Sequence, residues 1–196
     1  MSARVAAVIL AGGRSSRFGR DKLAEPIDGR PMLDHVIERV RAMAADVVVV
    51  AAADASLRPG AVVDADIVRD ERPYDGPLAG LSVGLRAVDP GVQHVIVVGG
   101  DMPTLVPAVL RRLILALDGH EAAVLADAER PRPLPLAIRR SVGSAAVERL
   151  LGDGERRLRA ILETLDVEVI APQTWRADDP TGESLRDVDT PGDLPG

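Results

Sequence analysis

Short apolar runs rich in valine punctuate the first half of the chain. Four such runs occupy residues 4–10, 46–53, 61–68 and 93–99. Nearly continuous β-branched runs of this length are typical of strands that are buried on both faces, as in a parallel sheet. The pattern therefore predicts four core strands within the first hundred residues.

A different spacing of apolar residues between these runs predicts helices. Leu33, Val36, Ile37 and Val40 fall at positions i, i+3, i+4 and i+7, which places them on one face of a helix, and residues 105–117 repeat the pattern. Strands that alternate with amphipathic helices are typical of an α/β fold, in which helices cover the faces of a mostly parallel sheet.

The second half of the chain is less regular. We expect strands at 122–126, 134–138 and 166–171, and helices near 141–151 and 155–165. The polar segment 172–186 contains two prolines and a glycine, which predicts a surface loop. No repeat or linker interrupts the sequence, so we expect a single domain over residues 1–196.

Composition narrows the class of protein. Hydrophobic residues make up 46% of the chain and charged residues 28%, which is ordinary for a globular protein. The net charge of −6 and the aromatic content of 2% argue against a surface that binds nucleic acid. The absence of cysteine excludes disulfides, thiolate metal sites and a cysteine nucleophile. No apolar stretch approaches the roughly 18 residues of a membrane helix, and we expect a cytoplasmic protein without membrane contact.

The stretch LAGGRSSRFGRDK at residues 10–22 directly follows the first predicted strand. Glycines at the carboxyl end of a parallel strand let the backbone approach a ligand and direct its N–H groups toward phosphates. Four cations within nine residues suit a triphosphate: Arg14, Arg17, Arg20 and Lys22. The alternative is an ordinary glycine turn with solvated arginines. The spacing fits neither a P-loop nor the G-x-G-x-x-G fingerprint of dinucleotide binding.

Acidic side chains follow other predicted strands. Asp101, in the sequence GGDMP, comes directly after the strand at 93–99, where it could hold Mg²⁺ or cap the helix that follows. Asp187 and Asp189 alternate as in a strand, so they could supply a second metal ligand or serve as a cap. The turn-prone segment RDERPYDGPLAG at 69–80 would emerge at the same edge of the sheet as the other loops.

Together these segments resemble the molybdenum cofactor guanylyltransferase family, within the wider group of sugar-nucleotide-type nucleotidyltransferases. LAGGRSSRFGRDK is similar to the opening signature of the wider group. RDERPYDGPLAG, VVGGDMPTL and DVDTPGDL resemble the guanylyltransferase branch, in that order along the chain. PLPLAIRR and GERRLRAIL resemble its acceptor-side half, so the resemblance spans residues 10 to about 194.

The resemblance implies a three-layer α/β/α, Rossmann-like nucleotidyltransferase fold with a mostly parallel central sheet. It implies a nucleotide-binding half at about 1–104 and an acceptor-binding half at about 105–196. The implied reaction transfers GMP from GTP to the phosphate of molybdopterin, with Mg²⁺ as cofactor, and releases pyrophosphate. The implied protein partners are the molybdenum-insertion protein and the molybdoenzymes.

Roles for individual residues also come from the resemblance. It implies backbone contacts to the nucleotide at Leu10, Ala11, Gly12 and Gly13, and triphosphate contacts from Arg17 and Lys22. It implies that Asp70 contacts the guanosine and that Gly76 and Pro77 border the base. It also implies that Asp101 binds Mg²⁺, with Asp189 as a possible further ligand. Asp187 and Asp189 stand where some relatives have asparagine. The chain departs from the pattern at Ala51, Ala52 and Ala53, where some relatives carry an asparagine that touches the nucleotide.

Other functions compete with this interpretation. A sister enzyme that uses CTP, on molybdopterin or another phosphorylated acceptor, shares most of the motifs. The pair Gly12–Gly13 and the segment GPLAG favour guanine by resemblance. A non-catalytic nucleotide-binding protein on the same fold would be expected to lose the loop lysine or the metal carboxylate, and the sequence retains both Lys22 and Asp101.

Overall fold

A seven-stranded sheet forms the centre of the computed structural model, which describes residues 3–12, 22–53, 65–70 and 75–194. Across the sheet the strands lie in the order β5-β4-β1-β6-β8-β7-β9. Along the chain they are β1 (Val5–Ala11), β4 (Asp46–Ala52), β5 (Asp66–Asp70), β6 (His94–Gly99), β7 (Ala122–Asp127), β8 (Arg130–Arg139) and β9 (Val167–Ile170). Only β8 runs antiparallel to its neighbours, β6 and β7, while the other pairs are parallel. The sheet is therefore mostly parallel, as predicted.

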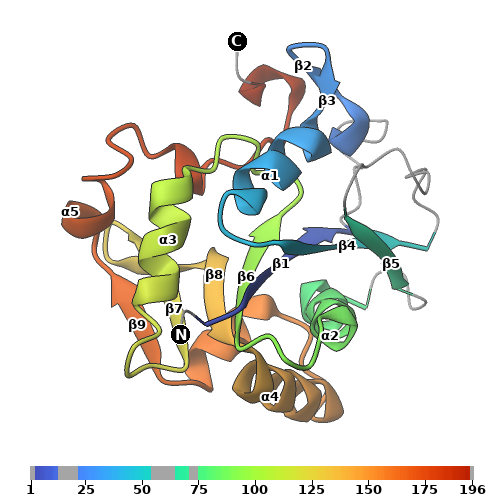
Figure 1. Ribbon diagram of the computed structural model, residues 1–196, viewed down its shortest axis with the longest axis vertical. Helices are drawn as coiled ribbons and strands as arrows, with labels where there is room; N and C mark the ends of the chain where they lie inside the picture. Colours follow the sequence, from blue (N-terminus) through green and yellow to red (C-terminus); the bar gives the residue numbers. More distant parts are fainter. Residues whose placement is uncertain (1–2, 13–21, 54–64, 71–74, 195–196) are drawn as a thin grey trace.

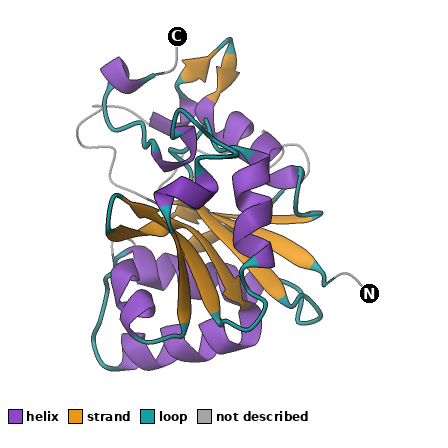
Figure 2. Cartoon of the chain, turned by 90° about the vertical axis from the view of Figure 1, so that its left-hand side faces the viewer, coloured by secondary structure: helices purple, strands orange, loops and turns teal. Residues whose placement is uncertain are grey.

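Helices cover both faces of this sheet (Figures 1 and 2). On one face lie α1 (Met32–Arg41) and α3 (Pro107–Leu115), and on the other lie α2 (Pro77–Ala87) and α4 (Arg140–Gly152). Alternate residues of β1 face opposite layers, because side chains of a strand point to the two faces in turn. Ala7 and Ile9 pack with α1 and α3, while Ala6 and Val8 pack with α2 and α4. The three-layer α/β/α architecture is confirmed.

The helix predicted from the i, i+3, i+4, i+7 stripe is α1. All four of its apolar residues, Leu33, Val36, Ile37 and Val40, are at most 5% exposed. On the opposite face α2 lies so close to the sheet that a Cβ on Gly84 would overlap the side chain of Val8. Glycine is the residue that permits this approach.

The predicted strands agree with the observed ones to within a few residues, with two differences. β8 begins at Arg130, four residues before its predicted start at 134. β5 begins at Asp66, whereas the prediction began at 61, and residues 61–64 lie outside the described part of the chain. The helix predicted at 155–165 is a shorter 3-10 helix, η2 (Leu158–Glu163).

Short elements complete the fold. A 3-10 helix, η1 (Lys22–Ala24), and a small hairpin of β2 (Pro26–Ile27) and β3 (Arg30–Pro31) precede α1. The chain later forms α5 (Pro172–Trp175) and the 3-10 helices η3 (Glu183–Leu185) and η4 (Pro191–Asp193). Within the described residues, no helix is long and apolar enough to cross a membrane.

The prediction of a surface loop at 172–186 holds only in part, because most of the segment is exposed or half-buried but three of its side chains are buried. Trp175 is completely buried, and its indole N–H donates to the backbone carbonyl of Ala126 at 2.9 Å. Asp179 and Ser184 are also buried, with exposed fractions of 2% and 0%. The polar sequence hides this packing, because Asp179 and Ser184 are hydrogen-bonded inside the protein instead of facing water.

Candidate functional site

The carboxyl ends of β1 and β6 lie side by side in the middle of the sheet. They are held together beyond the strands by a hydrogen bond of 2.9 Å from the backbone N–H of Gly100 to the carbonyl of Leu10. From β1 the strand order continues to β4 on one side and to β6 on the other. Open α/β sheets bind ligands outside the carboxyl ends of strands where the order reverses in this way.

Ala11 ends β1 and is 7% exposed, and the exposed Gly12 follows it directly. A Cβ on Gly12 would lie 3.6 Å from the backbone nitrogen of Ala52, an ordinary contact distance. The packing of the described residues therefore does not itself demand glycine here, which suits a position that a ligand approaches closely. Gly13 and Arg17, which the sequence also assigned to this loop, lie outside the described residues.

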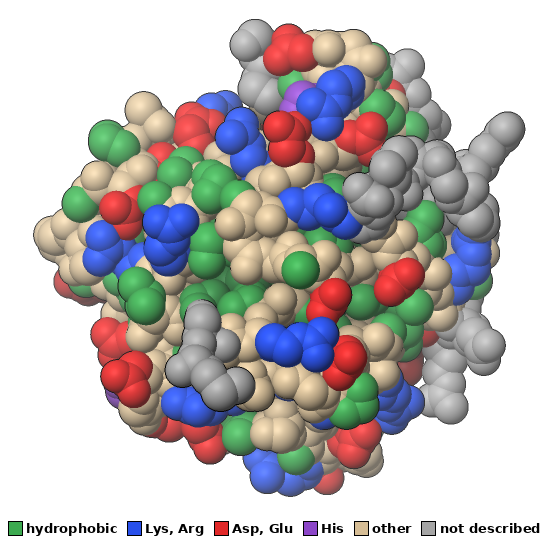
Figure 3. All heavy atoms as spheres, viewed as in Figure 1, with side chains coloured by type: hydrophobic (Ala, Val, Ile, Leu, Met, Phe, Trp, Pro, Cys, Tyr) green, Lys and Arg blue, Asp and Glu red, His purple; other side chains and the backbone are tan. Residues whose placement is uncertain are grey.

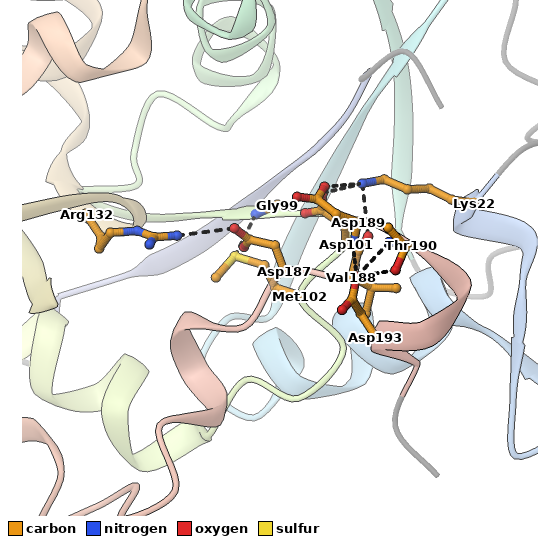
Figure 4. Close-up of polar contacts among 10 residues, drawn as sticks. All are labelled: Lys22, Gly99, Asp101, Met102, Arg132, Asp187, Val188, Asp189, Thr190 and Asp193. Carbon is orange, nitrogen blue, oxygen red and sulfur yellow. Dashed lines mark hydrogen bonds and ion pairs between the residues drawn. The ribbon is translucent and has the colours of Figure 1, made fainter. Parts of the chain in front are cut away.

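Lys22 stands at one end of a polar cluster at this edge (Figure 4). Its Nζ donates to Oδ2 of Asp101 at 2.7 Å and to the backbone carbonyl of Val188 at 3.2 Å. Oδ1 of Asp189 lies 3.7 Å from the same nitrogen. The fold thus joins three segments that the sequence had singled out separately. Lys22 is also the only lysine among 24 basic residues of Lys and Arg type in the chain.

The segment that carries Asp187 and Asp189 is not a strand, contrary to the alternation expected from sequence. Instead, the backbone N–H of Val188 donates to the carbonyl of Asp101 at 2.9 Å, and the Val188 side chain is buried. A capping box between Thr190 and Asp193 then starts η4. The two aspartates still diverge, because Asp189 reaches Lys22 while Asp187 points toward Arg132 (Figure 4).

Asp187 lies in surroundings that disfavour its charge. Burial raises the pKa of its carboxyl, and the negative charges of Asp101 and Asp189 raise it further. The positive charges of Arg132 and Lys22 only partly offset these effects. The cluster therefore holds several carboxylates that repel one another, an arrangement that a bound cation would relieve.

Carboxylate oxygens are the donors that hard divalent cations such as Mg²⁺ prefer, so the chemistry of this cluster fits such an ion. Asp101 is the best placed donor, with Asp189 beside it across Lys22. Among the residues that the structure describes, no group of three or more His, Cys, Asp or Glu side chains is arranged as a metal cage. Mg²⁺ is commonly bound by one or two carboxylates together with substrate phosphates, which needs no such cage.

Gly76 and Pro77 start α2 at the same edge of the sheet. Gly76 has a φ of 90°, and a Cβ there would lie 2.8 Å from the carbonyl oxygen of Arg156. Arg156 in turn donates from Nε to Oδ1 of Asp75 at 2.7 Å. The start of α2 is therefore fixed by a residue about eighty positions later in the chain, and glycine is the residue that the geometry accepts.

Asp70 ends β5, two strands away from β1, or roughly 10 Å at the usual strand spacing. The neighbouring Arg69 donates from Nη1 to the carbonyls of Ala52 and Ala53, at 3.4 and 3.2 Å. An arginine thus binds the backbone at the end of β4, where the sequence resemblance led us to expect an asparagine.

Two surface cavities, of about 710 and 450 Å³, lie away from this edge. The larger one borders the amino ends of β1, β4 and β6, and the smaller one lies between α3 and β9. Neither is lined by any residue that the sequence assigned to the site. On the face shown in Figure 3, basic and acidic side chains are interspersed over the described residues. Among the described residues, converging side chains define the candidate site.

The family model for the MobA-like NTP transferase domain matches residues 7–169, which is most of the chain. The matched region contains both Lys22 and Asp101. This chain belongs to the MobA-like NTP transferase family. It is accordingly a nucleotidyltransferase, as the sequence predicted.

Relatives of this MobA-like protein carry consistent names. It is 33% identical over 192 residues to the probable molybdenum cofactor guanylyltransferase of Chloroflexus aggregans, covering 95% of this chain and 90% of the relative. It is 36% identical to the molybdenum cofactor guanylyltransferase of Rhizobium meliloti, over 80% of this chain and 73% of that one. The crystal structure of molybdopterin-guanine dinucleotide biosynthesis protein A from Archaeoglobus fulgidus has the same fold, with a TM-score of 0.77, 24% identity and coverage of 96% and 94%.

The main site residue that sequence reasoning missed in this MobA-like protein is Arg132. It lies near the start of β8, between Asp127 and Asp187, at 3.6 and 3.3 Å. No motif marks it, because it reaches the site only through the pairing of β8 with β6. To place Arg132 at the site, one must know that β8 runs antiparallel to β6, and the apolar pattern at 134–138 does not give the direction of the strand.

Proposed function

We propose that this protein transfers GMP from GTP to the terminal phosphate of molybdopterin, forming the guanine dinucleotide form of the molybdenum cofactor and releasing pyrophosphate. The observation that carries the proposal is the contact between Lys22 and Asp101, which joins a phosphate-binding loop to a metal-binding carboxylate. The names of the relatives support the choice of GTP and molybdopterin. The molybdenum-insertion protein and molybdoenzymes are proposed as the partners that precede and follow this step.

The nucleotide is proposed to lie across the carboxyl ends of β1, β4 and β5. Backbone groups from Leu10 to Gly13 would face its phosphates, and Asp70 would contact the guanosine. Gly76 and Pro77 would border the base, at a segment that Arg156 holds in place. Arg17 and Lys22 would bind the triphosphate, where their charges favour the departure of pyrophosphate.

The chemistry requires no covalent intermediate with the protein. An oxygen of the acceptor phosphate attacks the α-phosphorus of GTP and forms a new P–O bond. The bond from the α-phosphorus to the bridging oxygen breaks, and pyrophosphate leaves with that electron pair. The protein contributes mainly by positioning the reactants and stabilising the charge that develops in the transition state.

Asp101 is proposed to hold Mg²⁺, with Asp189 as a further ligand. When bound, the ion would neutralise charge on the phosphate oxygens of the nucleotide. Lys22 pairs with both carboxylates, so its ammonium group would lie beside the ion and the triphosphate.

A thermal-shift comparison of GTP, CTP, UTP and ATP, each with Mg²⁺, tests the nucleotide. A ligand that binds only the native state raises its stability in proportion to the logarithm of its concentration over Kd. We expect the largest rise in melting temperature with GTP. Equal shifts for the four nucleotides, or a preference for CTP, would overturn the guanylyl assignment without affecting the fold.

Lys22→Ala and Lys22→Arg test the phosphate-binding role of the loop. Both variants should fold, because the side chain, 15% exposed, contacts polar groups and belongs to neither hydrophobic core cluster. We expect GTP binding, measured by calorimetry, to weaken in both, since a planar guanidinium does not replace a compact ammonium group between two carboxylates. Unchanged binding in Lys22→Ala would remove Lys22 from the proposed site.

A further inference from the structure

The pairing of β8 with β6 brings Arg132 to the level of Asp101. The two strands are antiparallel, with His94 opposite Arg139 and Val97 opposite Leu136. If this register is carried past the ends of the ladder, residue 132 falls opposite residue 101. Arg132 therefore lies near the start of the strand next to β6, at the sheet edge where β6 ends at Gly99, two residues before Asp101.

The same stretch of β8 departs from regular pairing with its other neighbour, β7. Val124 pairs with Leu136 and Ala126 with Pro131, so residues 132–135 of β8 stand opposite Leu125 alone. Irregularities of this kind redirect side chains and are frequent beside active sites. Here the irregularity begins at Arg132, whose guanidinium points to Asp187 (Figure 4).

The ion pairs of Arg132 are longer than those of two other arginines, Arg156 and Arg112. Its nearest carboxylate oxygens, on Asp187 and Asp127, lie at 3.3 and 3.6 Å, and its side chain is 37% exposed. The structural pairs of Arg156 with Asp75 and of Arg112 with Asp178 measure 2.7 and 2.6 Å. Charge-assisted hydrogen bonds of this type are normally 2.7–2.9 Å long. Arg132 can therefore exchange its partners for a ligand at little loss.

Two cations stand at opposite ends of the carboxylate cluster, Lys22 at one end and Arg132 at the other (Figure 4). An anionic nucleophile that approaches these carboxylates is repelled unless a cation receives it. Lys22 belongs to the nucleotide side in the proposed function. We propose that Arg132 binds the phosphate group of the acceptor substrate, and that Asp187 holds the guanidinium in place before the acceptor arrives. This proposal rests on the proposed function, in which a phosphate is the nucleophile.

The substitution Arg132→Ala, studied in the full chain, tests the role of the guanidinium. In transfer assays with GTP, Mg²⁺ and molybdopterin, we expect the KM for molybdopterin to rise roughly tenfold or more. The KM for GTP and the thermal shift caused by GTP should stay as in the wild type. Arg132→Lys should recover part of the lost affinity, because it restores the charge without the bidentate geometry.

Arg130→Ala is the matched control, since Arg130 lies two residues earlier on the same strand and is exposed. It removes the same charge from the same region and should leave every parameter unchanged. If Arg132→Ala behaves like Arg130→Ala, the proposal is wrong. If Arg132→Ala lowers the melting temperature and weakens GTP and molybdopterin alike, Arg132 is a structural link and the proposal is again wrong.

A second measurement separates this proposal from the proposed function. Inorganic phosphate is titrated into the protein in the presence of Mg²⁺ and a GTP analogue that cannot react, and binding is followed by calorimetry. We expect Arg132→Ala to bind phosphate at least tenfold more weakly than Arg130→Ala does, whatever the natural acceptor is. Wild-type protein that binds phosphate through Arg132 but does not modify molybdopterin would refute the acceptor and leave the role of Arg132 intact. Equal phosphate binding by both variants would refute that role.

Discussion

Two aspartates in the C-terminal segment, Asp179 and Asp187, lie in contrasting surroundings. Asp179 is 2% exposed and accepts backbone hydrogen bonds from Gly182, Glu183 and Ser184, at 3.0, 3.0 and 2.7 Å. Burial acts to raise the pKa of Asp179, but these hydrogen bonds outweigh it and hold that pKa below its usual value. The protein itself satisfies this carboxylate.

Asp187 shows the opposite balance. Its pKa is raised by burial and by the neighbouring charge of Asp101, and its nearest cation, Arg132, lies at 3.3 Å. The fold thus favours the ionised form of Asp179 and disfavours the ionised form of Asp187, which lies only eight residues later in the chain. Groups with perturbed pKa values of the second kind concentrate at functional sites, because a ligand supplies the compensation that the protein lacks. The comparison therefore separates a structural turn at 179–185 from the segment at 187–189, which we propose to bind a ligand.

The largest effect is expected at Asp101, which belongs to the binding cluster. Asp101→Asn removes one negative charge while keeping the size of the side chain. We expect turnover to fall by roughly 10²-fold or more, as when a main stabiliser of transition-state charge is lost. Asp101 caps no helix, since the N-cap of α3 is Val106, and asparagine keeps an oxygen that can accept from Lys22, so the melting temperature should change little. Pyrophosphate release in the presence of GTP and molybdopterin is the quantity to measure.

Activity of Asp101→Asn within a few-fold of the wild type would contradict the metal-binding role. It would then assign Asp101 to the structural class that Asp179 represents, and direct the search for the metal ligand to Asp187 and Asp189.

Asp179→Ala should show the reverse profile, with a large loss of stability. The substitution leaves the backbone N–H groups of Glu183 and Ser184 without their acceptor, while that of Gly182 keeps its bond to the backbone carbonyl of residue 179. Hydrogen bonds to charged groups contribute about 1.5–3 kcal/mol each, and unsatisfied buried donors cost a similar amount, so we expect a loss of roughly 3 kcal/mol. Denaturant unfolding measures it, with Glu183→Gln as a control in the same turn. A loss below about 1 kcal/mol would show that the turn is held by other contacts.

Asp101 and Asp179 also show how much of the fold and of the candidate site can be predicted from the sequence. The buried strands and α1 can be predicted from local patterns, because the layers against which an element packs determine the spacing of its apolar residues. The proximity of Lys22 to Asp101 follows from the rule that parallel strands end at one edge. Arg132 could not be predicted, since its position depends on the direction of β8. The role of Asp179 could not be predicted either, because a run of turn-forming residues gives no sign that tertiary packing buries it.

The pH dependence of stability should separate wild type from Asp179→Asn. The pKa of Asp179 is lower in the folded protein than in the unfolded chain, so its ionised form stabilises the fold at pH values above the unfolded pKa of 3.8. This contribution is lost as the pH falls from that value through the folded pKa. We expect the difference in melting temperature to be constant near neutral pH and to shrink below about pH 4. A difference that grows on acidification would contradict the lowered pKa.

The smallest effect on stability is expected at Asp187, with the opposite sign to that at Asp179. The folded-state pKa of Asp187 is raised, so the ionised carboxylate is disfavoured in the folded protein at neutral pH. Asp187→Asn removes this charge and keeps a group that can accept from Arg132. The side chain is 38% exposed, and solvent screening limits the gain, so we expect added stability of no more than about 0.5 kcal/mol at pH 7.

The gain should be accompanied by a higher KM for molybdopterin, because the neutral amide holds the Arg132 guanidinium less firmly than the carboxylate does. Such a variant, more stable but less active, is the outcome expected where a site keeps an unfavourable charge for its ligand. Chemical unfolding at pH 7 and transfer kinetics on the same protein preparation measure the two effects together. A loss of stability in Asp187→Asn would show that the ion pair with Arg132 outweighs the repulsion from Asp101, and that Asp187, like Asp179, is held by the fold.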